Sequence, residues 1–329
     1  MVKKEALFWK PLKNGNVQCL LCPHNCILTP GQVGLCNGKQ NIDGRLIAIN
    51  YGETVSLAID PIEKKPLYHY MPGSSILSTA PNGCNLRCPF CQNYSISVLK
   101  THTEYISPEE LIKLALRYNS PSIAFTYSEP LIWYEYILDV ARLAEEEGIK
   151  LVLVTNGMIN EEPLLKLLPH IHGMNIDLKS MDERYYRRVL KGDLKTVKRT
   201  ISIAQEKTHI EVTNLIIPGD NDRKEDIEKL VDFIASLRKT IPLHFSRYFP
   251  HHKYTKPPTP PDTMRMAFEI GKKKLYYVYV GNIFLPGTEN TYCPECGNLL
   301  VERSFYQTRI MGIKDGKCSR CSREVDFVL

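Results

Sequence analysis

Short apolar runs alternate with amphipathic stretches from about residue 74 onward. The apolar runs predict strands at 75–80, 122–126, 150–155, 174–178, 209–217, 242–247 and 275–280. The stretches between them predict helices at 107–118, 130–147, 161–168, 182–190, 193–206, 223–238 and 262–273. Strands that alternate with helices form parallel sheets, so we expect an α/β fold, a partial (β/α)6 TIM-like barrel over residues 74–287.

Residues 1–73 form a separate N-terminal segment in this interpretation. The segment carries the spacing Cys19-x2-Cys22-x3-Cys26-x9-Cys36, which provides four thiolates for one site. Tetrahedral sulfur ligation suits both zinc and iron–sulfur chemistry, so zinc and an auxiliary cluster are both open here.

Residues 288–329 form a short tail with two cysteine pairs. The spacing Cys293-x2-Cys296-x21-Cys318-x2-Cys321 is typical of a zinc ribbon. A tail of this length cannot build a core of its own, so we expect Zn²⁺ to hold it together, with rubredoxin-like iron as the alternative.

Composition narrows the function classes. All 11 cysteines fall in three clusters, a pattern that indicates metal ligation in a reducing compartment rather than disulfides. The net charge of +6 is modest and unclustered, which argues against a nucleic-acid partner. No apolar run approaches the ~20 residues of a membrane span, and the N-terminus leads into no apolar segment, so we expect a cytoplasmic protein without a signal peptide.

The third cluster, Cys84-x3-Cys88-x2-Cys91, follows the first predicted strand directly. Three thiolates leave one position of a [4Fe-4S] cluster open, and open positions are where metal sites do chemistry. The alternative is part of a structural zinc site with a distant fourth ligand. With Phe90 between the last two cysteines, the array resembles the signature of the radical S-adenosylmethionine (SAM) enzymes. That resemblance implies a catalytic [4Fe-4S] cluster on these cysteines, with SAM on the open iron as the source of a 5′-deoxyadenosyl radical.

Polar residues at the ends of the later strands fit the same resemblance. Segment 125–130 resembles the one that meets the methionine amino group of SAM, and segment 154–157 resembles the third-strand motif. Met174 to Lys179 and segment 214–219 resemble parts of pyruvate formate-lyase activating enzyme. The SAM contacts that the resemblance implies are Phe90, Tyr127, Ser128, Glu129, Asn156, Asp177, Lys179 and Asn214, with Lys179 also counted as catalytic. Plain alternatives are a helix-start glutamate at 129, a turn asparagine at 156 and a structural ion pair at 177 and 179.

The segment 244–250 is similar to the part of activating enzymes that approaches their substrate. Arg247, Tyr248, His251 and His252 would then lie on the substrate side, although a histidine pair on a loop is also typical of solvated surface.

Three stretches, 21–26, 60–70 and 84–94, resemble the radical SAM component of the AmmeMemoRadiSam system. That resemblance implies Memo-like and AMMECR-like partners and an electron donor such as ferredoxin or flavodoxin. The substrate stays open: a protein, as for activating enzymes, a small metabolite, or, against the charge pattern, RNA.

Overall fold

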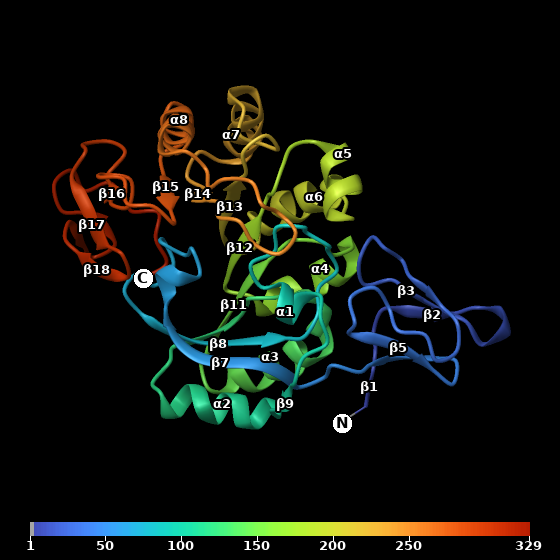
Figure 1. Ribbon diagram of the computed structural model, residues 1–329. Coiled ribbons are helices and arrows are strands. Elements are labelled where there is room, and N and C mark those ends of the chain that lie inside the picture. Colours follow the sequence, from blue (N-terminus) through green and yellow to red (C-terminus); the bar gives the residue numbers. More distant parts are fainter. Residues whose placement is uncertain (1–2) are drawn as a thin grey trace.

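The computed structural model, which describes residues 3–329, is built around a nine-stranded sheet in the order β15-β14-β13-β12-β11-β10-β8-β7-β9 (Figure 1). Positions 1 and 2 of the predicted N-terminal segment lie outside the described residues. The parallel strands are β8 (Ser75–Pro81), β10 (Ser122–Phe125), β11 (Lys150–Thr155), β12 (Gly173–Asp177), β13 (His209–Ile216), β14 (Leu243–Arg247) and β15 (Val278–Gly281). β15 forms one edge of the sheet and β9 the other, so the sheet does not close into a full barrel. Parallel strands joined by helices in such an open sheet confirm the predicted partial barrel.

Helices connect successive parallel strands. They are α2 (Pro108–Arg117), α3 (Tyr134–Glu146), α4 (Glu161–Leu167), α6 (Leu194–Ala204), α7 (Lys224–Leu237) and α8 (Pro261–Lys272). The predicted capping box opens α2: Ser107 Oγ accepts from the Glu110 N–H at 3.2 Å, and Glu110 Oε2 accepts from the Ser107 N–H at 2.9 Å.

Two helices differ from their predictions in detail. The helix expected at 130–147 begins as a 3₁₀ turn, η3 (Pro130–Trp133), before α3. The helix expected at 182–190 is a short α5 (Glu183–Tyr185) followed by a π-helical turn, η5 (Tyr186–Leu190), which ends at Lys191 with φ 58°. Periodicity does not distinguish α from π winding over a stretch this short.

The sequence analysis did not find strand β7 (Glu53–Pro61), which pairs antiparallel with β8, nor the edge strand β9 (Glu104–Tyr105), which pairs with β7. Leu57 and Ile59 of β7 are 40% and 41% exposed, so the apolar residues of this strand do not mark its buried face, and their pattern does not predict a strand. Part of the first 73 residues therefore belongs to the central sheet.

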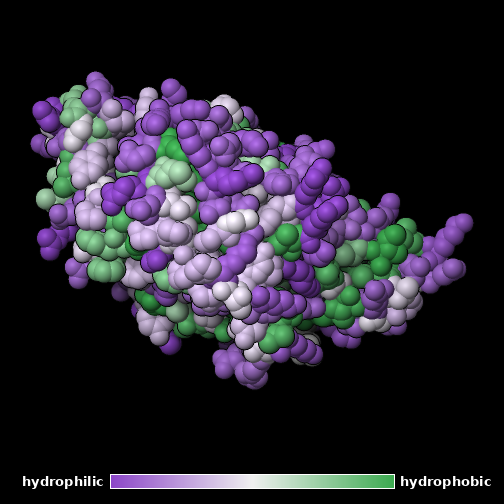
Figure 2. Space-filling model, turned by 45° about the horizontal axis from the view of Figure 1, so that its top comes forward, coloured by the Kyte–Doolittle hydropathy of each residue, from purple (hydrophilic) through white to green (hydrophobic). Residues whose placement is uncertain are grey.

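The rest of the N-terminal segment forms two small sheets at the right of Figure 1. One sheet has β1 (Lys4–Glu5), β6 (Arg45–Ala48) and β5 (Lys39–Ile42), and the other has β2 (Trp9–Pro11), β3 (Val17–Cys19) and β4 (Ile27–Leu28). Hydrophobic side chains gather on the surface at the right of Figure 2, and this segment contributes exposed apolar residues, among them Leu7, Ile27, Val33 and Leu35.

The C-terminal tail packs beside the far edge of the barrel. Its strands are β16 (Thr291–Tyr292), β17 (Leu299–Ser304), β18 (Gln307–Ile310), β19 (Ile313–Lys314) and β20 (Lys317–Cys318). Val328 N donates to the His69 carbonyl at 2.8 Å, and Met71 N donates to the Val328 carbonyl at 2.7 Å, so the chain end is fixed to the barrel. Within residues 3–329, no helix is long and apolar enough to cross a membrane.

Candidate active site and metal centres

A cavity of about 690 Å³ lies at the carboxyl ends of the parallel strands, where barrel enzymes place their chemistry. Every parallel strand contributes a lining residue from its end or from the loop that follows, and for β15 this residue is Asn282. The volume falls within the range of ~300–1,000 Å³ typical of small-molecule sites. Ten of the residues predicted for the site line this cavity: Cys84, Cys88, Phe90, Cys91, Tyr127, Ser128, Glu129, Asn156, Asp177 and Lys179.

Cys84, Cys88 and Cys91 sit on the loop after β8 and form part of the cavity wall. Cys84 Sγ accepts from the Leu86 N–H at 3.3 Å and from Asn156 Nδ2 at 3.6 Å. Burial raises the pKa of the Cys88 thiol to about 12 and raises the pKa of Cys84 well above its ordinary value. These thiols therefore favour the neutral form by themselves, and binding a metal or cluster would require them to lose their protons.

Glu129 anchors two neighbouring strand ends. Its carboxylate accepts from Leu131 N at 3.0 Å, Thr155 Oγ1 at 2.6 Å and Asn156 N at 2.9 Å. Burial raises the pKa of Glu129 to about 7, although these three donors oppose the shift. The carboxylate therefore caps η3 and fixes the end of β11 while it lines the cavity.

Asn156 links the end of β11 to the cysteine loop. Its Nδ2 donates to Asn85 Oδ1 at 2.9 Å as well as to Cys84 Sγ, and its Oδ1 accepts from Met158 N at 2.9 Å. The side chain is thus held in place on both sides, and it presents an N–H group to a cysteine sulfur.

Asp177 and Lys179 form an ion pair at the end of β12, with 2.8 Å between Asp177 Oδ2 and Lys179 Nζ. Burial alone would lower the pKa of Lys179, but Asp177 and Cys88 outweigh burial and raise it above the ordinary value. A charged lysine therefore faces the cavity beside the cysteine loop.

Asn214 lies elsewhere. The strand neighbours Thr213 and Leu215 line the cavity, whereas Asn214 is buried and its Nδ2 donates to the Leu178 carbonyl at 2.7 Å. The structure thus gives this side chain a contact between β12 and β13. The alternation of side chains along a strand explains the difference, because adjacent residues point to opposite faces.

A polar cluster behind Tyr127 was missed as part of the site. Asp60, at the end of β7, accepts from Lys64 at 2.7 Å, from buried Lys65 at 2.6 Å and from the Tyr127 hydroxyl. The donors hold the pKa of Asp60 below its ordinary value even though burial opposes this. Lys64 and Tyr127 both line the cavity, and Tyr127 has φ 64°, a conformation that this cluster stabilises.

On the opposite side, Arg247, Tyr248 and His251 line the cavity as expected for the substrate side. His252 stands apart: its ring stacks on Tyr94 with centroids 4.6 Å apart. Tyr306, from the turn between β17 and β18, also lines the cavity, which the sequence analysis did not anticipate because nothing in the tail's pattern shows where it docks.

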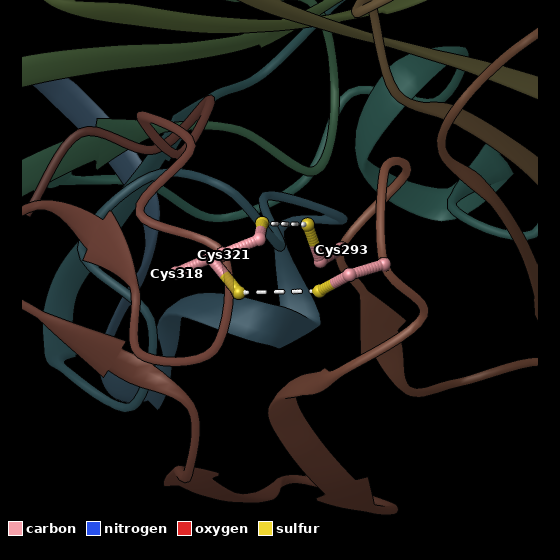
Figure 3. Close-up of side chains that lie close together, drawn as sticks. Cys293, Cys318 and Cys321 are labelled. Atoms are coloured by element: carbon pink, nitrogen blue, oxygen red, sulfur yellow. Dashed lines mark hydrogen bonds between the residues drawn. The ribbon is translucent and has the colours of Figure 1, made fainter.

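The four tail cysteines converge on one point (Figure 3). The Cys293 and Cys321 sulfurs are 3.6 Å apart, as are those of Cys296 and Cys318, and all four lie within 4.8 Å of one another. A tetrahedral ion with bonds of ~2.3 Å to sulfur needs sulfurs ~3.8 Å apart, so this set can hold a single metal ion such as zinc.

The N-terminal cysteines surround a second, smaller cavity of about 20 Å³. Cys19, Cys22, Cys26 and Cys36 all line it, together with His24, Lys39, Asn85 and a set of apolar side chains. The predicted set is therefore brought together in space.

The comparisons agree with this geometry. A family model described as the radical SAM superfamily matches residues 79–234. An uncharacterised protein of Methanocaldococcus jannaschii is 42% identical over 335 residues, covering 99% of this chain and 100% of that protein. A pyruvate formate-lyase-activating enzyme of Clostridium pasteurianum is 28% identical over 165 residues, covering 47% of this chain and 68% of the enzyme.

Among solved structures, a radical SAM methyltransferase from Sphaerobacter thermophilus is similar with a TM-score of 0.52 and 12% identity, covering 93% of this chain and 81% of that one. Identity this low shows the fold alone. The superfamily match includes the Cys84–Cys91 loop and the strands whose ends line the large cavity. This match and the relatives show that the chain carries, over residues 79–234, a domain of the radical SAM superfamily of enzymes.

Proposed function

We propose that this enzyme cleaves SAM reductively at a [4Fe-4S] cluster held by Cys84, Cys88 and Cys91. The observation that carries the proposal is the placement of these three thiols on one wall of a cavity large enough for SAM, at the carboxyl ends of the strands. When bound, the cluster supplies one electron that breaks a carbon–sulfur bond of SAM, and the resulting 5′-deoxyadenosyl radical takes a hydrogen atom from the substrate.

The chain's own residues then bind and orient SAM. Lys179 offers a cation to the anionic end of SAM, and Asp177 keeps that lysine charged and in position. Glu129 and Asn156 fix the end of β11 against the cysteine loop. The N–H groups of Leu86 and Asn156 that point at Cys84 tune the cluster's reduction potential.

For the substrate, we propose a protein or a protein-bound group. The support is the similarity to relatives named pyruvate formate-lyase-activating enzyme and putative glycyl-radical enzyme activating enzyme. Arg247, Tyr248 and His251 would face that substrate. A low-potential donor of the ferredoxin or flavodoxin class would supply the electron, and Memo-like and AMMECR-like proteins are the partners we would test. A cytoplasmic location stays a prediction from the sequence.

The test begins with anaerobic protein, a reductant and SAM, with 5′-deoxyadenosine measured by mass spectrometry. We expect product from the wild type and none from Cys88→Ser. The matched control is Cys321→Ser, which removes one thiol from the tail at a position that does not line the cavity. Product from Cys88→Ser at the wild-type rate would overturn the cluster assignment.

The substrate class needs a second experiment. The anaerobic enzyme, the reductant and unlabelled SAM are incubated in deuterium-free buffer with a candidate substrate protein prepared from deuterated cells. The 5′-deoxyadenosine product is then analysed for deuterium. Deuterium transfer supports a protein substrate. Transfer only from a deuterated small-molecule extract would show that the substrate is a metabolite.

A further inference from the structure

The three cysteine sets differ in how close their sulfurs lie. Across residues 3–329, only the tail set has metal-ligand atoms of three or more residues that all lie within 4.8 Å of one another. Cys84, Cys88 and Cys91 do not meet that spacing, and neither do any three of the N-terminal cysteines. A single tetrahedral ion requires sulfurs ~3.8 Å apart. The N-terminal set is therefore wider than a one-ion site and resembles, in this respect, the set assigned above to a cluster.

The wide spacing does not come from cysteines that point in different directions. Cys19, Cys22, Cys26 and Cys36 all line one small cavity, together with apolar side chains that include Leu131 and Met158. A volume of about 20 Å³ exceeds the ~10–15 Å³ that one water-sized sphere occupies. Four thiols, of which Cys19 is buried and the other three are partly exposed, thus face a shared space.

Hydrogen-bond donors surround these sulfurs. Gly38 N lies 3.4 Å from Cys36 Sγ, and the backbone N–H groups of Leu21 and His24 donate to Cys19 and Cys22. Lys39, which is buried, also lines the cavity, but its charge is balanced by a buried salt bridge to Glu135 at 2.5 Å. The backbone amide donors are therefore the groups that would stabilise an anionic centre, as thiolate-bound clusters are.

This site also lies directly behind the Cys84 loop. Asn85 lines the N-terminal cavity, its carbonyl contacts His24 Nε2 at 2.6 Å, and its Nδ2 donates to the Met158 carbonyl at 2.8 Å. Gly83 packs so tightly on Cys36 that a Cβ at Gly83 would lie 2.2 Å from the Cys36 carbonyl oxygen. One peptide step of ~3.8 Å then leads from Gly83 to Cys84.

We propose that Cys19, Cys22, Cys26 and Cys36 hold a second iron–sulfur cluster rather than zinc, placed back to back with the SAM site across Gly83 and Asn85. The nature of this centre stands on its own geometry. Only its place beside a first cluster rests on the proposed function.

The test is the metal content of protein purified anaerobically, without reconstitution, from cells supplied with both iron and zinc. The key variant replaces Cys84, Cys88 and Cys91 with alanine, which removes the first cluster. We expect this variant to retain iron and acid-labile sulfide in equal amounts, with about one zinc ion per chain from the tail. About two zinc ions per chain and no sulfide would overturn the proposal.

A reverse variant guards against misfolding of the first. Cys22→Ser combined with Cys36→Ser should lose part of the wild-type iron and sulfide, and an unchanged iron content would overturn the proposal. The electron paramagnetic resonance spectrum of the fully reduced wild type should show spin coupling between two clusters that neither variant shows. Wild-type protein with iron only in the N-terminal set would contradict the proposed function and leave this inference intact, so the two failures are distinguishable.

Discussion

Gly83 is the position where a single methyl group should disturb the cysteine loop most. Its φ of 124° is one that residues with a Cβ rarely adopt, and the added carbon would lie 2.2 Å from the Cys36 carbonyl oxygen and 3.0 Å from Ile132 Cδ1. The backbone conformation costs about 1–3 kcal/mol. Relieving the overlap moves backbone, since the nearest atom is a carbonyl oxygen, and overpacking of this kind costs about 1–3 kcal/mol more. We therefore expect Gly83→Ala to lower the free energy of unfolding by about 2–6 kcal/mol.

Two other glycines separate the two contributions. Gly148 has φ 68° and open space where a Cβ would stand, so Gly148→Ala should cost only about 1–2 kcal/mol of backbone strain. Gly281 has open space and no positive φ, so Gly281→Ala should change the free energy of unfolding by no more than about 0.5 kcal/mol.

The assay is urea unfolding of anaerobically purified protein, followed by far-ultraviolet circular dichroism, with the slope and midpoint fitted together. The reasoning is refuted if Gly83→Ala is no less stable than Gly148→Ala, because the contact with Cys36 would then carry no energy. The same samples should be assayed for iron, since a displaced Cys36 carbonyl disturbs the N-terminal set as well as the loop that carries Cys84.

Three more predictions address the ion pair, a buried histidine and the tail. Lys179→Met should raise the SAM concentration for half-maximal cleavage about tenfold, equivalent to ~1.4 kcal/mol. The control Lys166→Met, which removes an exposed ion pair with Glu162, should leave that concentration unchanged. Equal effects of the two variants would contradict the role of Lys179. Burial lowers the pKa of His69 from 6.5 to about 3, so between these pH values the unfolded chain binds a proton that the folded chain does not. The free energy of unfolding should therefore fall by roughly 1–4 kcal/mol as the pH drops from 6.5 toward 3. His69→Gln should flatten that dependence in urea titrations at several pH values, and an unchanged slope would rule out His69 as its source. Cys321→Ser should lose about one zinc ion per chain and unfold at a lower urea concentration yet keep SAM cleavage within about twofold; unchanged stability would show that the metal does not support the tail.

The sequence predicts the barrel well because its strands are buried on both faces. β11 is apolar at four of its six positions and polar only at its two ends, and strands of this kind stand out against the amphipathic helices between them. The residues that end those strands could be located from the same pattern, because carboxyl ends of parallel strands meet at one edge. For this reason the sequence alone predicts Asp177 and Lys179 at the strand ends, where both line the cavity.

The missed parts share a different physical cause, which is contact between segments distant in the chain. β7 exposes Leu57 and Ile59, so its pattern does not reveal a strand until β8 is beside it. Asp60 precedes Lys64 and Lys65 in the sequence, and its place at the cavity becomes visible only through the hydrogen bond from Tyr127, 67 positions away. Tyr306 enters the cavity only because the tail docks on the barrel. Asn214 shows the converse: its position at a strand end was right, but the alternation of side chains turned it away.

Cysteine spacing has the same limit. The N-terminal and tail sets each provide four thiols, and both allow zinc or iron because the ligands are identical. What separates them is distance in space, since one ion draws four sulfurs into a tetrahedron whereas a cluster holds them apart on different irons. The tail cysteines lie on facing turns with pairs at 3.6 Å, while the N-terminal ones face a cavity whose opposite wall is Asn85 of the SAM-cluster loop. If the proposed second cluster is present, two sets with the same residues hold different metals, and the set with the wider spacing is the one that adjoins the Cys84 loop.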